Sequence, residues 1–197
     1  GRAVVIRWRR GNWSRLAKRE LADAWPWIIM AAIPALVLLA LRPWLIWVGA
    51  ALAALWAVSV WLTRTGHERG ASNDLLLVAQ ACLAVPLMWG IAMNAPGLGV
   101  GDPAATDAWV AAFICLVFFV GSVLHVKSLI READNRRWAI ASRVYHLLAL
   151  AMGFISPWLL LPFGFAAVRA FVVPTRSRPG VIGIWETIVS VLIVASC

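Results

Sequence analysis

The chain has 197 residues, of which 62% are apolar and only 14% are charged, and this balance excludes an ordinary soluble globular domain. Several apolar runs are long enough to cross the hydrocarbon core of a bilayer, so the composition indicates an integral membrane protein. A formal charge of +9 would suggest nucleic acid as the partner of a soluble chain, whereas here the positions of the basic residues explain the charge.

Residues 1–24 are predicted to form a basic juxtamembrane segment on the cytoplasmic face. Lysine and arginine greatly outnumber Glu20 and Asp23 there, and each basic side chain near anionic headgroups contributes roughly 1 kcal/mol to membrane binding. No aromatic platform or folded module accompanies these cations, so we expect lipid and not nucleic acid as the partner. The chain opens at Gly1 without a secretory signal pattern, and we expect the native N-terminus to lie upstream.

Apolar runs between polar loops predict an all-α fold, a polytopic transmembrane helix bundle with about seven spans in residues 25–197. The spans are expected at residues 25–41, 43–63, 74–95, 108–127, 139–155, 158–173 and 182–196. Pro34, Pro86 and Pro162 fall inside three of these spans, where proline removes a backbone hydrogen bond and kinks a helix.

The distribution of basic residues predicts the orientation of the spans. All 18 lysine and arginine residues except Arg42 fall on loops and helix ends of one side. Cytoplasmic loops of membrane proteins carry this excess, so the N-terminus is expected in the cytoplasm and the C-terminus outside a bacterial plasma membrane. The loop at residues 96–107 contains no basic residue and is expected on the outer side.

Polar side chains from distant parts of the sequence are expected at one depth, just inside the cytoplasmic boundary. Ionisable groups at this depth are costly unless they are paired, hydrated or used on a ligand. A half-buried cup of cations with a few carboxylates would suit a phosphate or diphosphate headgroup. The candidate ligand-binding residues are Asn73, Asp74, His125, Lys127, Arg131, Tyr145, His146, Arg169 and Glu186. Four of them are predicted to meet in one pocket: Asp74, Lys127, His146 and Glu186.

Simpler interpretations stay open for several of these residues. Asn73 and Asp74 could cap the third span, since both are favoured at helix N-termini. Arg131 could serve topology alone, and Glu186 could pair with Arg169 across neighbouring helices.

Neither a metal site nor catalytic residues are assigned from the sequence. His146 lacks a convincing third ligand, and Cys82, Cys115 and Cys197 have neither disulfide nor zinc spacing. The sequence does not identify a cofactor.

Several sequence blocks resemble the YwiC-like family of bacterial multi-spanning membrane proteins. The blocks are ERGASNDLLLV at residues 68–78, VKSLIRE at 126–132, the Tyr145–His146 pair and IGIWE at 182–186, and the likeness extends over residues 64–197. The resemblance implies a multi-pass membrane protein and no particular activity. Members of the family usually begin with a further apolar region carrying an HGAW-type motif, which is absent from this sequence.

A weaker resemblance is to UbiA-type prenyltransferases, helical bundles with an aspartate-rich diphosphate site at the cytoplasmic side. That resemblance would imply magnesium, bridged to diphosphate by carboxylates at i, i+4 spacing. Here Asp74 is followed one turn later by Val78, and Asp134 by Trp138, so a transferase of this kind is doubtful.

The sequence therefore leaves two alternative functions. The first is a non-catalytic subunit, or an accessory or assembly factor, of a membrane complex. The alternative is a UbiA-like protein that binds or transfers a polyprenyl phosphate. We favour the first, with membrane lipids and other membrane subunits as partners. A face of small residues in the second span, Gly49, Ala53 and Ala57, permits close packing with another helix inside the chain or in a partner.

Overall fold

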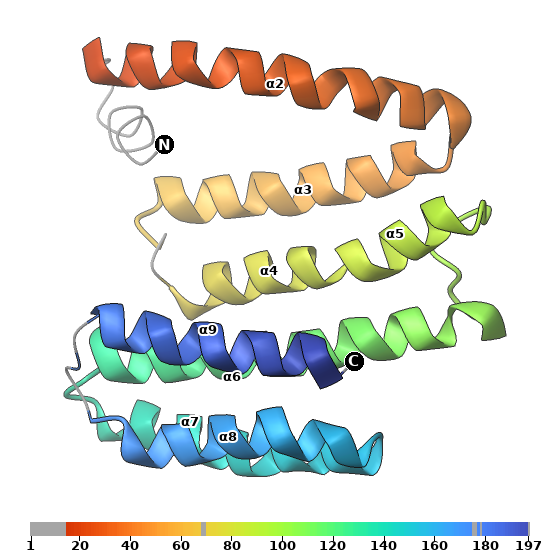
Figure 1. The fold of residues 1–197 in the computed structure, drawn as a ribbon. Coiled ribbons are helices and arrows are strands. Elements are labelled where there is room, and N and C mark those ends of the chain that lie inside the picture. Colours follow the sequence, from red (N-terminus) through yellow and green to blue (C-terminus); the bar gives the residue numbers. More distant parts are fainter. Residues whose placement is uncertain (1–14, 68–69, 175–176, 178, 197) are drawn as a thin grey trace. The chain divides into compact units, whose positions relative to one another are not determined.

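The structure, a computed structural model, describes residues 15–67, 70–174, 177 and 179–196. Within those ranges the regular structure consists of α-helices and short 3-10 helices, without a strand, which confirms the all-α prediction (Figure 1). The α-helices are α2 (Arg15–Leu41), α3 (Leu45–Arg64), α4 (Ala71–Cys82), α5 (Ala84–Ala92), α6 (Thr106–Ile130), α7 (Arg136–Ala149), α8 (Leu160–Val172) and α9 (Pro179–Ser196). The 3-10 helices are η1 (Pro103–Ala105), η2 (Leu150–Phe154) and η3 (Pro157–Leu159).

The helices fall in the order expected from the hydropathy pattern. The span expected at residues 74–95 is divided into α4 and α5 at Leu83. Pro86 lies just inside α5 and has no backbone N–H to donate to Cys82, four residues earlier, which weakens the helix at this point, although α2 continues through Pro26 and Pro34. The chain thus has seven helical segments in its described part when α4 and α5 are taken together and the 3-10 helices are joined to their neighbours.

Four segments are long and apolar enough to cross a membrane by length and composition: Ala22–Leu41, Leu45–Arg64, Ala71–Ala92 and Pro103–Ile130. Two shorter apolar helices follow at Pro157–Val172 and Gly180–Ser196. At 1.5 Å per α-helical residue and 2.0 Å per 3-10 residue, α7 with η2 is about 31 Å long, η3 with α8 about 25 Å and α9 about 27 Å. These lengths approach the thickness of the hydrocarbon core of a bilayer. The structure therefore agrees with the prediction of about seven spans.

The chain divides into two compact units. The first contains residues 1–80 and 87–103, and the second contains residues 81–86 and 104–197. Residues 1–14, Glu68, Arg69, Thr175, Arg176, Arg178 and Cys197 lie outside the described residues. Most of the basic juxtamembrane segment expected at residues 1–24 therefore falls outside the described part, while α2 begins within that segment at Arg15.

In the second unit, α6 packs against α7, α7 against α8, α8 against α9, and α9 against α6. The turns from α6 to α7 and from α8 to α9 lie at the same end of this unit (Figure 1). Leu129, Val173 and Ile182 form a small apolar cluster near that end. The main apolar core of the four helices comprises Ile114, Phe118, Ala149, Leu159, Phe163, Ala166, Val189 and Ile193.

The spacing of these core residues leaves a gap that polar side chains fill. Along α6, Phe118 belongs to the main core and Leu129 to the small cluster, and His125 is buried between them. Along α9, Glu186 falls between Ile182 and Val189 in the same way. Helical side chains three or four residues apart share a face, so a polar layer lies between two apolar layers in the second unit.

Candidate functional site

The polar layer consists of six residues contributed by all four helices of the second unit. They are Ser122 and His125 of α6, Ser142 and His146 of α7, Arg169 of α8 and Glu186 of α9. Ser142, His125, His146 and Arg169 are buried, although an arginine is almost never fully buried in a protein unless it is paired. The layer therefore needs a physical explanation.

Arg169 and Glu186 carry the opposite charges of the layer. Their closest atoms, Nη1 and Oε1, are 2.7 Å apart, and the Arg169 side chain is 1% exposed while that of Glu186 is 21% exposed. The Ser122 hydroxyl donates a hydrogen bond of 2.7 Å to the other carboxylate oxygen, Oε2. The carboxylate of Glu186 thus links α9 to α8 through an ion pair and to α6 through a hydrogen bond. The pairing of Glu186 with Arg169, one of the simpler interpretations of the sequence, is confirmed.

His125 and His146 connect α6 to α7. Their ring centroids are 5.8 Å apart and the rings meet edge to face, at 72°. The Nδ1 atom of His146 lies 2.7 Å from the Ser142 carbonyl oxygen, which can only accept, so Nδ1 carries the hydrogen. In the neutral ring, Nε2 is then left as an acceptor. A Cβ on Gly121 would lie 3.3 Å from that Nε2, so the glycine lets the imidazole approach α6 closely.

Several polar atoms of this layer are buried without a hydrogen-bond partner among the described residues. They are Nε2 of His125, Oγ of Ser142, the three guanidinium nitrogens of Arg169 and Oε1 of Glu186. The contact between Arg169 and Glu186 is thus close in distance but not aligned as a hydrogen bond. A buried polar atom without a partner costs about 1–3 kcal/mol, so this concentration of them makes the layer the candidate functional site.

A crevice beside the layer is almost closed. It is lined by Val117, Phe118, Gly121, Tyr145, His146, Ala149, Phe163, Ala166 and Arg169. Its walls leave no room for a water molecule, which needs roughly 10–15 Å³ of its own. Water on this side therefore does not satisfy the guanidinium of Arg169.

The remaining candidates of the second unit lie beside the layer. Tyr145 is half-buried, and its hydroxyl donates a 2.8 Å hydrogen bond to the Val117 carbonyl oxygen, so this group fixes α7 to α6. Lys127 is buried in the last turn of α6. Arg131 follows the end of α6 and is exposed. Of the candidates, the structure thus brings together His125, His146, Arg169 and Glu186, with Tyr145 adjacent.

Asn73 and Asp74 belong to the first compact unit. Asn73 is buried in the first turn of α4, where its side-chain oxygen accepts a 2.7 Å hydrogen bond from the Ser59 hydroxyl of α3. Asp74 is half-buried in the same turn. The expected capping position is wrong for both residues, because α4 begins earlier, at Ala71. A carboxylate in the first turn still interacts favourably with the helix dipole.

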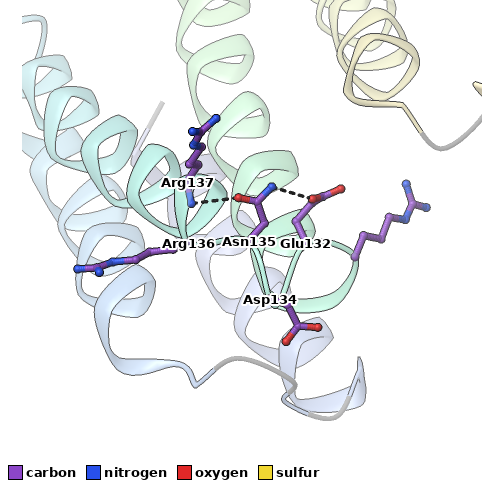
Figure 2. Close-up of a pocket in the computed structure, with 6 residues that line it drawn as sticks. Glu132, Asp134, Asn135, Arg136 and Arg137 are labelled. Atoms are coloured by element: carbon purple, nitrogen blue, oxygen red, sulfur yellow. Dashed lines mark hydrogen bonds between the residues drawn. The ribbon is translucent and has the colours of Figure 1, made fainter.

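The turn from α6 to α7 carries the second charged group of this unit. A hollow of about 480 Å³ is lined by Arg131, Glu132, Asp134, Asn135, Arg136 and Arg137. Asn135 caps α7: its side-chain oxygen accepts from the Arg137 backbone N–H at 3.1 Å, and its Nδ2 donates to Glu132 at 3.3 Å. Figure 2 shows the side chains of Arg136 and Arg137 pointing in different directions. Cations that diverge in this way suit contact with a membrane surface better than a phosphate clamp.

Two serines that hold candidate residues in place escaped the sequence interpretation. Ser122, which holds Glu186, and Ser59, which holds Asn73, were not among the candidates. Ser122 lies three residues before His125 on the same face of α6, and this spacing could have revealed it. In the described part of the chain, no group of three His, Cys, Asp or Glu residues is placed to hold a metal ion.

Comparison with known proteins finds one family and two curated relatives. A family model described as YwiC-like protein matches residues 3–89. The uncharacterized protein YwiC of Bacillus subtilis (strain 168) is 35% identical over 150 residues, which cover 75% of this chain and 59% of the relative. An uncharacterized protein of Haemophilus influenzae is 32% identical over 129 residues, which cover 61% of this chain and 48% of the relative. No solved structure matches the chain.

The matched regions refine the resemblance seen in the sequence. The family model covers the N-terminal part of the chain, which the likeness over residues 64–197 left out. The Bacillus relative covers 75% of the chain, so its match extends well past residue 89. This chain spans about half the length of the curated relatives it matches. The family model and the Bacillus relative carry the same name, and the chain belongs to the YwiC-like family.

Proposed function

We propose that the protein is a non-catalytic component of a bacterial membrane complex, a subunit or an assembly factor, that holds the phosphate headgroup of a lipid at the polar layer. The observation that carries this proposal is the enclosed guanidinium of Arg169, whose three nitrogens have no hydrogen-bond partner among the described residues. Phosphate oxygens match the planar fork of an arginine, and the low dielectric of a membrane interior strengthens such contacts.

The position of the layer supports a headgroup as its ligand. The layer lies near the end of the second unit where α6 ends and α9 begins. The excess of basic residues assigns this end to the cytoplasmic side. The arginines of the α6–α7 turn would attract anionic headgroups to this end, where each cation contributes roughly 1 kcal/mol.

The surface of α3 supports a role as a subunit. Gly49, Ala53 and Ala57 lie on one face of α3 and are all exposed, and nothing lies within 4 Å of a Cβ built on Gly49. Small residues on a membrane helix let another backbone approach closely, so this face suits a helix of a partner subunit.

The alternative, a UbiA-like protein that binds or transfers a polyprenyl phosphate, shares the headgroup with the first proposal. Transfer would in addition require carboxylates that hold magnesium on a diphosphate. The polar layer as described holds one carboxylate, Glu186, and so lacks the further carboxylates that would hold magnesium. Binding without transfer is therefore the function that the geometry supports best.

The orientation can be tested by labelling single cysteines in a chain whose own cysteines, Cys82, Cys115 and Cys197, are replaced by alanine. A cysteine at Gly99 is expected to react with an impermeant thiol reagent in intact cells, because its loop carries no basic residue. A cysteine at Ser177 is expected to react only after the cells are opened. The opposite pattern would reverse the topology and place the polar layer on the outer side.

Ligand retention tests the proposed function itself. Native mass spectrometry of the protein purified in mild detergent is expected to show a bound lipid phosphate, which Arg169→Gln loses. Arg143→Gln is the matched control, because Arg143 is exposed on α7 and contacts the Ala170 carbonyl oxygen and the Phe171 ring. Equal loss of lipid from both variants, or a wild-type protein with no lipid phosphate, would contradict headgroup binding at Arg169. A stoichiometric partner protein in the same preparation would support the subunit role.

A further inference from the structure

The contact between Arg169 and Glu186 is incomplete as an ion pair. A well-formed pair of arginine and carboxylate has two parallel N–H···O bonds. Here one nitrogen, Nη1, approaches one oxygen, Oε1, at 2.7 Å without the alignment of a hydrogen bond. The donors of the guanidinium are therefore available to a better acceptor that takes the place of the carboxylate.

Glu186 has a second attachment that would remain if it left Arg169. The Ser122 hydroxyl donates to its other oxygen at 2.7 Å, and this bond does not involve α8. The carboxylate can thus move off the guanidinium while one of its oxygens stays hydrogen-bonded inside the unit. Such a retained bond lowers the free energy that is lost when the ion pair opens.

An anion can reach the buried guanidinium of Arg169 only from the side of the Glu186 carboxylate. The crevice on the side of His146 and Phe163 has no room for even a water molecule. Glu186 is 21% exposed, whereas Arg169 is 1% exposed, so the carboxylate is the member of the pair that can be reached from outside. An anion that reaches Arg169 does so from this side and takes the place of the carboxylate.

We infer that Glu186 is a built-in competitor for the anion site: its carboxylate occupies the position that a phosphate group of the ligand takes on Arg169. This inference rests on the proposed function and goes beyond it, because it assigns to Glu186 the control of affinity. The shared chemistry is a phosphate group, which can come from a lipid headgroup or from free phosphate. The ligand exchanges one anion for another on a single buried cation, and the expelled carboxylate remains on Ser122.

Glu186→Gln is therefore expected to bind phosphate more tightly than the wild-type chain. Removing a competing negative charge is expected to lower Kd at least about tenfold, since juxtaposed like charges cost several kcal/mol and 1.4 kcal/mol corresponds to a factor of ten. The binding of phosphatidic acid would be measured in nanodiscs of zwitterionic lipid, and that of inorganic phosphate in a separate arm. A gain confined to phosphatidic acid identifies a lipid headgroup, and a gain in both arms identifies a general phosphate site.

Glu132→Gln is the matched control, because it removes the same charge from the α6–α7 turn of the same unit. It is expected to leave Kd within about twofold, since Glu132 is only half-buried and lies outside the polar layer, where water and salt screen its charge. Arg169→Gln is expected to abolish binding, alone or combined with Glu186→Gln. Ser122→Ala is expected to leave Kd within about twofold, because its hydrogen bond to Glu186 is present both before and after the exchange and so largely cancels from the affinity.

Wild-type binding without a gain in Glu186→Gln would overturn this inference and leave the proposed function standing. An equal gain in Glu132→Gln would also overturn it, because the effect would then be one of net charge. If no protein of the set bound phosphate in either arm, the proposed function would fall and the inference with it. If Glu186→Gln did not fold, Glu186→Ala would decide, since binding by that variant no tighter than by the wild-type chain contradicts the exchange.

Discussion

Arg169→Met is expected to destabilise the folded protein by about 3–5 kcal/mol, the loss typical when one partner of a buried ion pair is removed. The variant leaves the Glu186 carboxylate inside the second unit with Ser122 as its remaining hydrogen-bond partner among the described residues. Because Glu186 is 21% exposed, it keeps some hydration, and the loss is expected near the lower end of that range. Unfolding by increasing SDS in mixed micelles, followed by circular dichroism, measures the change.

Two further variants separate the loss of the charge pair from the loss of an arginine. Arg143→Met removes an exposed arginine of α7 and is expected to cost at most about 1 kcal/mol, the value of a single hydrogen bond. The double variant Arg169→Met with Glu186→Leu is expected to recover most of the stability, because replacing both partners by apolar groups is often neutral. If Arg169→Met were no worse than Arg143→Met, the pair would have no structural role.

The helices and their order follow from the sequence for a simple physical reason. A segment without water must satisfy its own backbone hydrogen bonds, so long apolar runs become helices whatever their neighbours are. The same argument found the shorter segments α8 and α9, and Pro86 marked the division between α4 and α5. Helix ends were less certain, and the start of α4 at Ala71 instead of Asp74 removed the expected cap.

The polar layer could be predicted in part. The sequence gives the depth of a residue in a span by counting from a loop, and depth brought His125, His146, Arg169 and Glu186 to one level. Depth does not give the order in which helices pack, and the contact of α9 with α6 joins segments far apart in the chain. Ser122 was missed for this reason, since its partner Glu186 lies on α9. The meeting of Asp74 with Lys127, His146 and Glu186 stays a prediction, because Asp74 belongs to the other unit.

Gly90→Ala tests the packing of the first unit. Gly90 lies near the end of α5, and the chain folds back over it: the Ala95 backbone N–H donates to the Gly90 carbonyl oxygen at 3.0 Å. A Cβ at this position would overlap the Gly97 carbonyl oxygen and approach the Trp44 ring at 3.2 Å. Backbone atoms cannot turn aside as a flexible side chain can, so the variant is expected to lose about 3 kcal/mol, the upper part of the range for overpacking.

Gly49→Ala is the matched control, because Gly49 also lies inside a helix, α3, but a Cβ there meets nothing within 4 Å. Alanine is favoured over glycine in a helix interior by about 0.5–1 kcal/mol, so this variant is expected to be slightly more stable than the wild-type chain. The same substitution in two helices is thus expected to act with opposite signs when unfolding in SDS is compared. Equal effects at both positions would contradict the close approach of Gly97 to Gly90, since helix propensity alone predicts a gain at each.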